Sequence, residues 1–320
     1  MISNGKFYES QFEEATIELL REAHWQYAFG DDIHRKYTDP LIEEDLRNFL
    51  TVQYKDKNLT TSEMDSIVAN LRNTGGQNDY YALRNAFLLY RDGYDFAYSD
   101  GRDNPFRLEY IDFEHPDHNI FRCVNQFVME QGRENRRPDI LLFINGIPVC
   151  IIELKNPTKQ NATIHDAHTQ ICTRYMRDIP ALLKYCALAV ISDGAKNALG
   201  TTYTPFEFFY EWKKIENEDK AGKGLDTLRT LIRGALSPER ILEILRDYVY
   251  FPDPTKEDDT TEIVCRYPQF FATRKLRDHI LNHLRSVGGD GKGGTYFGAT
   301  GCGKTYTMLF LARQLALRCR

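Results

Sequence analysis

The sequence feature that most constrains the fold is the stretch RRPDILLFINGIPVCIIELKNP at residues 136–157. Two strongly apolar runs, 140–144 and 147–152, flank Asn145-Gly146, a dipeptide typical of a tight turn between antiparallel strands. The stretch therefore predicts a buried β-hairpin. Its second run nevertheless ends in Glu-Leu-Lys, and a carboxylate and an ammonium two residues apart are an uncommon end for an apolar strand.

The charged end of this hairpin suggests a metal site. Side chains alternate between the faces of a strand, so Glu153 and Lys155 share one face, and the hairpin brings Asp139 near Glu153. Neighbouring carboxylates repel each other, and a divalent cation relieves that repulsion. Mg²⁺ prefers oxygen ligands and can activate water for phosphodiester hydrolysis. From the spacing alone, a surface salt bridge between Glu153 and Lys155 fits as well.

The parity of the hairpin tests this hypothesis. A two-residue turn pairs residue 144 with 147 and places Asp139 opposite Ile152, on the wrong face for a site with Glu153. A shared site therefore requires either an odd loop or a β-bulge. We expect one of these, for example a three-residue loop with Gly146 in the left-handed conformation.

Hydrophobic periodicity and turn residues predict the other elements. Ser10 and Glu13 match a capping box at the start of a helix at 10–26. The aromatic segment 206–215 fits either a strand or a loop. Further helices are expected at 40–52 with Pro40 at its start, 61–75, 79–91, 160–177 with Pro180 just beyond it, 223–249 and 269–286, and strands within 107–115, 119–130 and 186–194.

A second motif, GATGCGKT at 298–305, fits the phosphate-binding loop of nucleotide hydrolases. It lies between an apolar segment and a helical one, so we expect a strand, a loop and a helix over 295–318. Backbone N–H groups of such a loop hold phosphates, the lysine reaches the β- and γ-phosphates and the threonine holds Mg²⁺. The expected ATP-binding residues are Gly298, Gly301, Gly303, Lys304 and Thr305, with Gln269 of the upstream RYPQ near the adenine.

The chain divides at 249–262, a segment with two prolines and a run of charges. We expect one domain at 1–248, a linker at 249–262 and the start of a second domain at 263–320. No room for a further acidic strand follows the glycine-rich loop. We therefore expect the N-terminal piece of a larger motor protein, without appreciable ATPase activity by itself.

Composition bounds the class of protein. The chain has 320 residues, a net charge of -5 and 42% apolar residues, as expected for a globular protein with no overall basic character. The seven cysteines are scattered and form no CxxC pair, so neither structural zinc nor a disulfide framework is expected. We expect a cytoplasmic location. No signal peptide and no membrane span are expected.

The stretch RPDILLFINGIPVCIIELKNP resembles the PD-(D/E)xK nuclease core of HsdR, the restriction subunit of type I restriction-modification enzymes. FEEATIELL at 12–20, NQF at 125–127 and VISDGAKNALG at 190–200 resemble the same family. FEFFYEWK at 206–213 does so too, and so does the order of nuclease before motor. The resemblance implies an α/β fold. Its restriction-endonuclease-like core is a mixed sheet flanked by helices, followed by the beginning of a RecA-like, helicase-type motor.

The resemblance also implies roles for single residues. Asp139 and Glu153 would bind the catalytic Mg²⁺, and Lys155 would be the catalytic lysine. The family has a Gln-x-x-x-Tyr motif on the next helix, but here four residues separate Gln170 from Tyr175. In an α-helix the extra residue rotates Tyr175 by about 100°. Either the helix is locally overwound or Tyr175 has another part.

Several other residues have two interpretations. Glu13 stands where the family has an acidic residue, but it also fits the capping box. His165 and His168 we interpret as a solvated helix face, and His115 and His118 as loop residues. The arginines just before Asp139 fit contacts with DNA phosphates or ordinary solvated charges: Arg133, Arg136 and Arg137.

Two hypotheses follow. The first is a Mg²⁺-dependent endonuclease module that cleaves duplex DNA after ATP-driven translocation, together with methyltransferase and specificity subunits. The second is a catalytically idle module of the same fold that docks the motor onto those subunits. The presence of Asp139, Glu153 and Lys155 favours the first.

Overall fold

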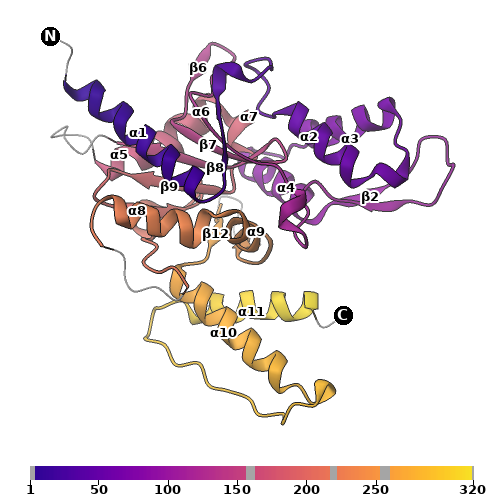
Figure 1. Cartoon of the computed structure of the whole chain (residues 1–320), viewed down its shortest axis with the longest axis vertical. Coiled ribbons are helices and arrows are strands. Elements are labelled where there is room, and N and C mark those ends of the chain that lie inside the picture. The colour runs from indigo at the N-terminus through magenta and orange to yellow at the C-terminus, as the bar shows by residue number, and fades with distance from the viewer. Residues whose placement is uncertain (1–3, 156–162, 217–221, 253–259, 319–320) are drawn as a thin grey trace.

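The computed structural model describes residues 4–155, 163–216, 222–252 and 260–318, and a six-stranded mixed sheet forms its centre (Figure 1). The strand order is β1-β4-β7-β8-β9-β10. β1 is parallel to β4 and β8 to β9, whereas the other neighbours are antiparallel. The strands are β1 (Gln26–Phe29), β4 (Phe121–Asn125), β7 (Ile140–Ile144), β8 (Ile147–Leu154), β9 (Leu188–Ser192) and β10 (Asn197–Gly200).

The predicted hairpin is confirmed as β7–β8. Ile144 pairs with Ile147, and Asn145 and Gly146 both have positive φ, at 50° and 77°, as a two-residue type I′ turn requires. A three-residue loop is therefore wrong. The predicted bulge is present further along the ladder, because Leu142 pairs with Cys150 and Phe143 with Pro148. Val149 is the extra residue, and beyond it Ile140 pairs with Ile152.

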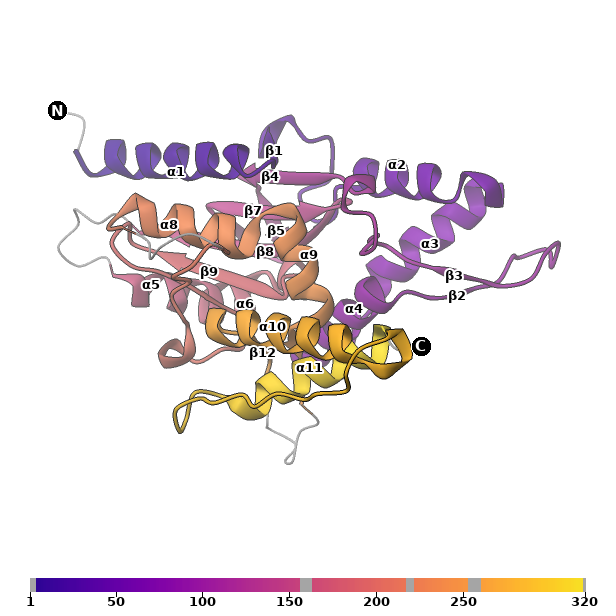
Figure 2. The same ribbon diagram turned by 60° about the horizontal axis from the view of Figure 1, so that its bottom comes forward.

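Different helices cover the two faces of the sheet. Ile140, Leu142 and Ile144 point into a core formed with α1, the α2–α4 helices, α8 and α9. Leu141 and Phe143 point into a second core formed with the α5–α7 segment. In Figure 2, α8 and α9 lie on the viewer's side of β7 to β9. This arrangement confirms the expected mixed sheet flanked by helices.

Most helices match the predicted ranges. Those before the hairpin are α1 (Asn4–Glu22), α2 (Glu43–Gln53), α3 (Thr61–Asn73) and α4 (Asp79–Asp92). Those after it are α5 (Ile164–Thr169), α6 (Met176–Asp178), α7 (Pro180–Leu183), α8 (Leu225–Leu231), α9 (Pro238–Asp247), α10 (Tyr267–His283) and α11 (Lys304–Arg318). Pro40 does not begin α2, which starts three residues later.

Two predicted helices are interrupted. The helix expected at 160–177 contains a π-helical turn, η4 (Gln170–Tyr175), between α5 and α6. The one expected at 223–249 contains a π-helical turn, η6 (Ile232–Leu236), between α8 and α9. Ser237 is extended and Pro238 begins α9, because proline suits the first turn of a helix but not its interior.

The capping box expected at Ser10 and Glu13 is wrong. α1 begins at Asn4, so Ser10 lies inside the helix, and the Glu13 carboxylate is hydrogen-bonded to side chains of another element. A capping box forms instead at Thr60 and Glu63, where α3 begins. A pattern of two residues was not sufficient to locate the start of a helix.

Short strands complete the fold. β2 (Tyr94–Phe96) pairs with β3 (Phe106–Leu108), β5 (Met129–Gln131) with β6 (Glu134–Arg136), and β11 (Val249–Tyr250) with β12 (Ile263–Val264). The ambiguous segment at 206–215 is mostly loop, with a short 3₁₀ turn, η5 (Phe206–Phe208), and one bridge from Tyr210 to Leu199. β1 and β10 were not foreseen.

The C-terminal helices α10 and α11 pack together beneath α9 (Figure 1). The Tyr248 ring lies 4.9 Å from that of Phe270 and 5.2 Å from that of Phe310, between ring centroids. The strand expected at 295–297 is absent, and Phe297 is 94% exposed. A single strand is held by its neighbours in a sheet, and no strand lies beside 295–297 in the described part of the chain.

The division at 249–262 stays a prediction, and residues 253–259 lie outside the described part of the chain. Among the described helices, none combines the length and the apolar character that crossing a membrane requires.

Candidate active site

Asp139 and Glu153 meet at one end of the central sheet. Because the bulge shifts the ladder by one residue, the position before Ile140 lies opposite the position after Ile152. The backbone N–H of Leu154 donates a 2.7 Å hydrogen bond to Oδ2 of Asp139. Both carboxylates are therefore on the sheet face that α5 and η4 cover, as the metal-site hypothesis required.

Lys155 lies beside Glu153 and connects β8 to the η4 turn through hydrogen bonds. Its Nζ donates hydrogen bonds of 2.6 Å to Oε1 of Glu153 and 2.7 Å to Oε1 of Gln170. The lysine side chain is 14% exposed and Glu153 is 1% exposed. The alternative of a solvated surface salt bridge is therefore wrong, because this ion pair is largely removed from water.

The π-helical turn η4 places Gln170 and Tyr175 on one side of the helix. Nε2 of Gln170 donates a 2.7 Å hydrogen bond to the Tyr175 hydroxyl. A π turn closes its hydrogen bonds over five residues instead of four, so it accommodates one extra residue. Of the two alternatives that the spacing left open, local overwinding is wrong, since the turn is wider than an α turn. The widening compensates for the fourth intervening residue.

The electrostatics of Glu153 fit a divalent cation. Burial, reinforced by the negative charge of Asp139 and opposed by Lys155, raises the pKa of Glu153 to about 8. Its Oε2 is buried without a well-formed hydrogen bond from a described residue, although the nearby Tyr175 hydroxyl acts to lower the pKa of Glu153. A metal ion would stabilise the ionised carboxylate and supply that oxygen with a partner. Asp139 and Glu153 are the residues of this chain that could hold it.

The three arginines before Asp139 have different surroundings. Arg136 is bound to acidic groups, since its guanidinium pairs with Glu134 and Asp178. Arg137 is exposed, and its NH1 donates a 3.1 Å hydrogen bond to the neutral amide oxygen of Gln126. Arg133 is exposed as well. Arg137 and Arg133 form no ion pair with a described residue, so their charges are available to an anionic ligand.

Glu13, Asn125 and Gln126 form a group of hydrogen-bonded polar side chains next to Arg137. The Glu13 carboxylate on α1 accepts hydrogen bonds from Asn125 Nδ2 at 2.6 Å and from Gln126 Nε2 at 3.2 Å. Gln126 has a φ of 56°, and a Cβ on Gly30 would lie 2.5 Å from its carbonyl oxygen. The family resemblance of the NQF segment and the acidic position of Glu13 were the sequence signals for this contact. Gln126 thus links Glu13 to Arg137.

The glycine-rich loop at 298–305 forms few contacts outside itself. Gly301 and Gly303 have φ of 79° and 81°, values that favour glycine. Nζ of Lys304 donates to the carbonyls of Gly298 and Ala299, at 2.9 Å each, and Thr305 is exposed. Gln269 is 5% exposed and donates to the Gly303 carbonyl at 3.3 Å, so the two predicted motifs do meet.

The histidine pair on α5 is only half solvated. His165 is exposed, whereas His168 is half buried and has a ring nitrogen 2.9 Å from the Thr204 carbonyl. His118 is the last residue of a 3₁₀ turn, η3 (Pro116–His118), and His115 directly precedes this turn.

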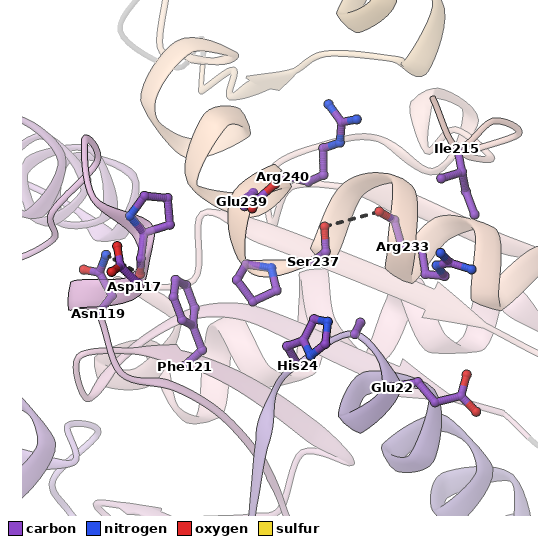
Figure 3. Close-up of a pocket in the computed structure, with 13 residues that line it drawn as sticks. Glu22, His24, Asp117, Asn119, Phe121, Ile215, Arg233, Ser237, Glu239 and Arg240 are labelled. Carbon is purple, nitrogen blue, oxygen red and sulfur yellow. Dashed lines mark hydrogen bonds between the residues drawn. The ribbon is translucent and has the colours of Figure 1, made fainter. Parts of the chain in front are cut away.

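A cavity of about 790 Å³ lies between the end of α1, the η3 turn and the start of α9 (Figure 3). His24, Asn119 and Phe121 line it together with Ser237, whose hydroxyl donates to the Arg233 carbonyl. Asp139, Glu153 and Lys155 are not among its lining residues. Its acidic and basic side chains are mixed, and we assign it no part in the site.

Comparison with known proteins shows the family to which the chain is similar. Residues 6–208 match the family model described as type I restriction enzyme R protein N terminus. The chain is 28% identical over 319 residues to the type I restriction enzyme HindI endonuclease subunit of Haemophilus influenzae, covering 96% of this chain and 30% of that protein. It is also 28% identical over 328 residues to the putative type I restriction enzyme MjaIXP endonuclease subunit of Methanocaldococcus jannaschii, covering 94% and 31%. The chain thus spans about a third of the length of these curated relatives.

Proposed function

The chain belongs to the family of type I restriction enzyme R protein N termini, and from this premise we propose that it is the Mg²⁺-dependent endonuclease module of such a subunit. Its substrate would be duplex DNA and its reaction the hydrolysis of phosphodiester bonds. The observation that carries the proposal is the convergence of Asp139, Glu153 and Lys155 at one sheet end, where Oε2 of Glu153 is buried without a hydrogen-bond partner among the described residues.

Each residue of the cluster has a part in this proposal. Asp139, held by the Leu154 N–H, and Glu153 would bind Mg²⁺, which supplies an activated water and charge neutralisation when bound. Lys155 would orient the attacking water or stabilise the negative charge that develops on the phosphate. Gln170 holds the Lys155 ammonium, and Tyr175 holds the amide of Gln170. Arg137 would contact a DNA phosphate, and Gln126 would aim its guanidinium.

The glycine-rich loop supports a second part of the proposal. Lys304 and Thr305, with the glycines of the loop and Gln269, would bind ATP and Mg²⁺ at the start of a motor. Cleavage would follow ATP-driven translocation of DNA by the longer protein. Methyltransferase and specificity subunits of the same restriction system would be its partners.

Metal binding tests the nuclease proposal directly. Crystals of the chain soaked in Mn²⁺ should give an anomalous peak between Asp139 and Glu153, and Asp139→Asn should remove it. Leu154 loses a hydrogen-bond acceptor of full charge in this variant, so its melting temperature is measured in parallel to verify folding. No peak at saturating Mn²⁺ in the wild-type chain would overturn the nuclease proposal and favour the docking module.

A further inference from the structure

A second cluster of metal-ligand type lies away from the sheet end. Asp112, His115 and His118 bring one carboxylate oxygen and two ring nitrogens within 4.8 Å of one another. We propose that these three side chains hold a transition-metal ion of the Zn²⁺ class, with solvent completing its coordination. This site is independent of the proposed nuclease chemistry.

The distances from Asp112 to the two histidines are close to those between neighbouring zinc ligands. Nδ1 of His118 lies 2.9 Å and Nδ1 of His115 lies 3.3 Å from Oδ2 of Asp112. Zinc bonds to histidine nitrogen and carboxylate oxygen are about 2.0–2.2 Å long, so neighbouring ligand atoms of a tetrahedral site are about 3.3 Å apart. The two rings are stacked, with centroids 4.8 Å apart and planes inclined by 23°. The two ring nitrogens lie within 4.8 Å of each other, and rotation of the exposed histidine side chains would bring both onto one ion.

Local structure explains why the three side chains converge. Oδ1 of Asp112 accepts the backbone N–H groups of Glu114 and His115, which folds the chain back over the carboxylate. Pro116 then begins the 3₁₀ turn η3, and side chains three residues apart are eclipsed in such a turn. His115 and His118 therefore project to the same side, where both ring nitrogens face Oδ2 of Asp112.

The turn is held in place by a buried amide network. Asn119 accepts the N–H of Asp112 at 2.9 Å and donates to its carbonyl at 2.7 Å. Asn145, in the hairpin turn, donates to Oδ1 of Asn119 at 2.8 Å. Gln53 donates to Oδ2 of Asp112 at 3.2 Å, a supporting contact of the kind that orients metal ligands. Asp112 is only 5% exposed, so the ligand set is preorganised on a rigid base.

Ligand chemistry selects the ion. Two imidazoles and one carboxylate suit Zn²⁺ and related transition metals, whereas Mg²⁺ prefers oxygen ligands alone. The His115 and His118 side chains are 63% and 49% exposed, so the ion reaches them from solvent. The two predicted sites of this chain should therefore separate by metal: Mg²⁺ at Asp139 and Glu153, and Zn²⁺ at Asp112.

An ion here would stiffen the junction between the sheet and α9. Arg246 of α9 pairs with Glu114 at 3.1 Å and donates to the Phe113 carbonyl at 3.4 Å, both within the same turn. The expected consequence is a more stable fold rather than a catalytic effect.

Cobalt serves as the spectroscopic probe, because it occupies zinc sites and absorbs visible light. The 320-residue chain is titrated with Co²⁺ in an excess of Mg²⁺, which occupies the oxygen-ligand site. We expect one equivalent of Co²⁺ with the absorption of a low-coordinate site, displaced by one equivalent of Zn²⁺. Zn²⁺ should also raise the melting temperature by about 3 °C or more.

The chain offers a matched control. His165 and His168 have the same H-x-x-H spacing, but the nearby Asp166 carboxylate is bound to Thr163 and His168 contacts a carbonyl, and no ligand group of three described residues includes them. His115→Ala and His118→Ala should each abolish the cobalt spectrum and the zinc-dependent stabilisation, while His165→Ala should leave both unchanged. Both ligand histidines are exposed, so these variants should fold. Cobalt absorption that persists in both variants, or a wild-type chain with no absorption at saturating Co²⁺, would overturn the proposal.

Discussion

The sheet end and the glycine-rich loop hold their charged groups in different ways. At the sheet end, Lys155 is bonded to Gln170, fifteen residues away, and Arg137 to Gln126, eleven residues away. In the loop, Lys304 is bonded to carbonyls only five and six residues away. Glu153 is 1% exposed, whereas Phe297, just before the loop, is 94% exposed.

This difference teaches which part of the chain is a formed site. Groups held by distant elements keep their geometry because each is fixed by a separate part of the core. In the glycine-rich loop, Lys304 is bound to carbonyls of the loop itself. The loop therefore has a defined backbone shape, but few distant elements fix its position. Among the described side chains outside 298–305, Gln269 and Thr307 donate hydrogen bonds to the loop, both to the Gly303 carbonyl. We therefore expect substitutions at the sheet end to have larger effects than those in the loop on any property of this chain alone.

The largest expected effect is on DNA cleavage. Asp139→Asn and Glu153→Gln each lower the cleavage rate about 100-fold or more, because metal ligation contributes several kcal/mol to the transition state. The measurement is plasmid cleavage by the longer subunit with its partner subunits.

Lys304→Ala separates the two regions. In the longer subunit it should abolish ATP-dependent cleavage too, but Mn²⁺ binding by this chain should stay within about twofold of wild type. Loss of Mn²⁺ binding in Lys304→Ala would show that the two regions are not separate.

The next effect is on stability as a function of pH. The pKa of Glu153, about 8 in the folded protein, lies above its ordinary value of 4.5. Its contribution is therefore fully favourable below pH 4.5 and is lost as the pH rises through 8. In the absence of divalent ions, Glu153→Gln should exceed the wild type in free energy of unfolding by about 5 kcal/mol at pH 9, and this difference should vanish near pH 4.5.

Glu262 is the matched control for this experiment. It is 2% exposed, its carboxylate oxygens accept no hydrogen bond from described residues, and burial raises its pKa well above the ordinary value. The free energy of unfolding of Glu262→Gln should also increasingly exceed that of the wild type as the pH rises. Added Mg²⁺ should reduce the difference between Glu153→Gln and the wild type, and it should leave the difference between Glu262→Gln and the wild type unchanged. Equal Mg²⁺ responses would contradict a metal site at Glu153. Denaturant unfolding at several pH values measures both differences.

A smaller effect is expected in DNA affinity. Arg137→Gln should weaken binding to duplex DNA several-fold and lower the magnitude of the slope of log K against log salt by about 0.9, the value for one lost phosphate contact. Arg136→Gln is the control, since Arg136 is already paired with Glu134 and Asp178 and should change the slope less. Equal slopes for Arg137→Gln and wild type would remove Arg137 from the DNA contacts. Fluorescence anisotropy at graded salt concentrations gives these slopes.

The smallest effect is expected from shortening the π turn. Thr173 is exposed within η4, and its deletion should convert the wide turn to an α turn while Gln170 and Tyr175 stay on one side. Stability should change by less than about 1 kcal/mol. Deletion of Arg177, in the α-helical turn α6, is the control and should destabilise the fold by several kcal/mol because it rotates the buried Asp178 and Ile179. Comparable losses in both deletions would show that η4 does not absorb an extra residue. Denaturant unfolding gives both values.

Local pattern was sufficient for the elements that are locally encoded. The β7–β8 hairpin follows from apolar runs around Asn145-Gly146, and α3 and α4 follow from their periodicity. The Ser10 and Glu13 pattern predicted the wrong start for α1, which begins at Asn4. The Glu13 carboxylate accepts hydrogen bonds from Asn125 and Gln126 instead of capping its own helix. The strand at 295–297 was wrong because a strand requires neighbours in space.

The sequence by itself determined which chemical groups this protein has: two carboxylates and a lysine at the end of an apolar hairpin, and the residue count that made a bulge necessary. Only the tertiary structure decided where that bulge lies and that a π turn brings Tyr175 back to Gln170. It alone gathered Asp112, His115 and His118 around one oxygen. The physical reason is that side-chain spacing along a chain is local, whereas ladder register and helix width are set by the packing of distant segments.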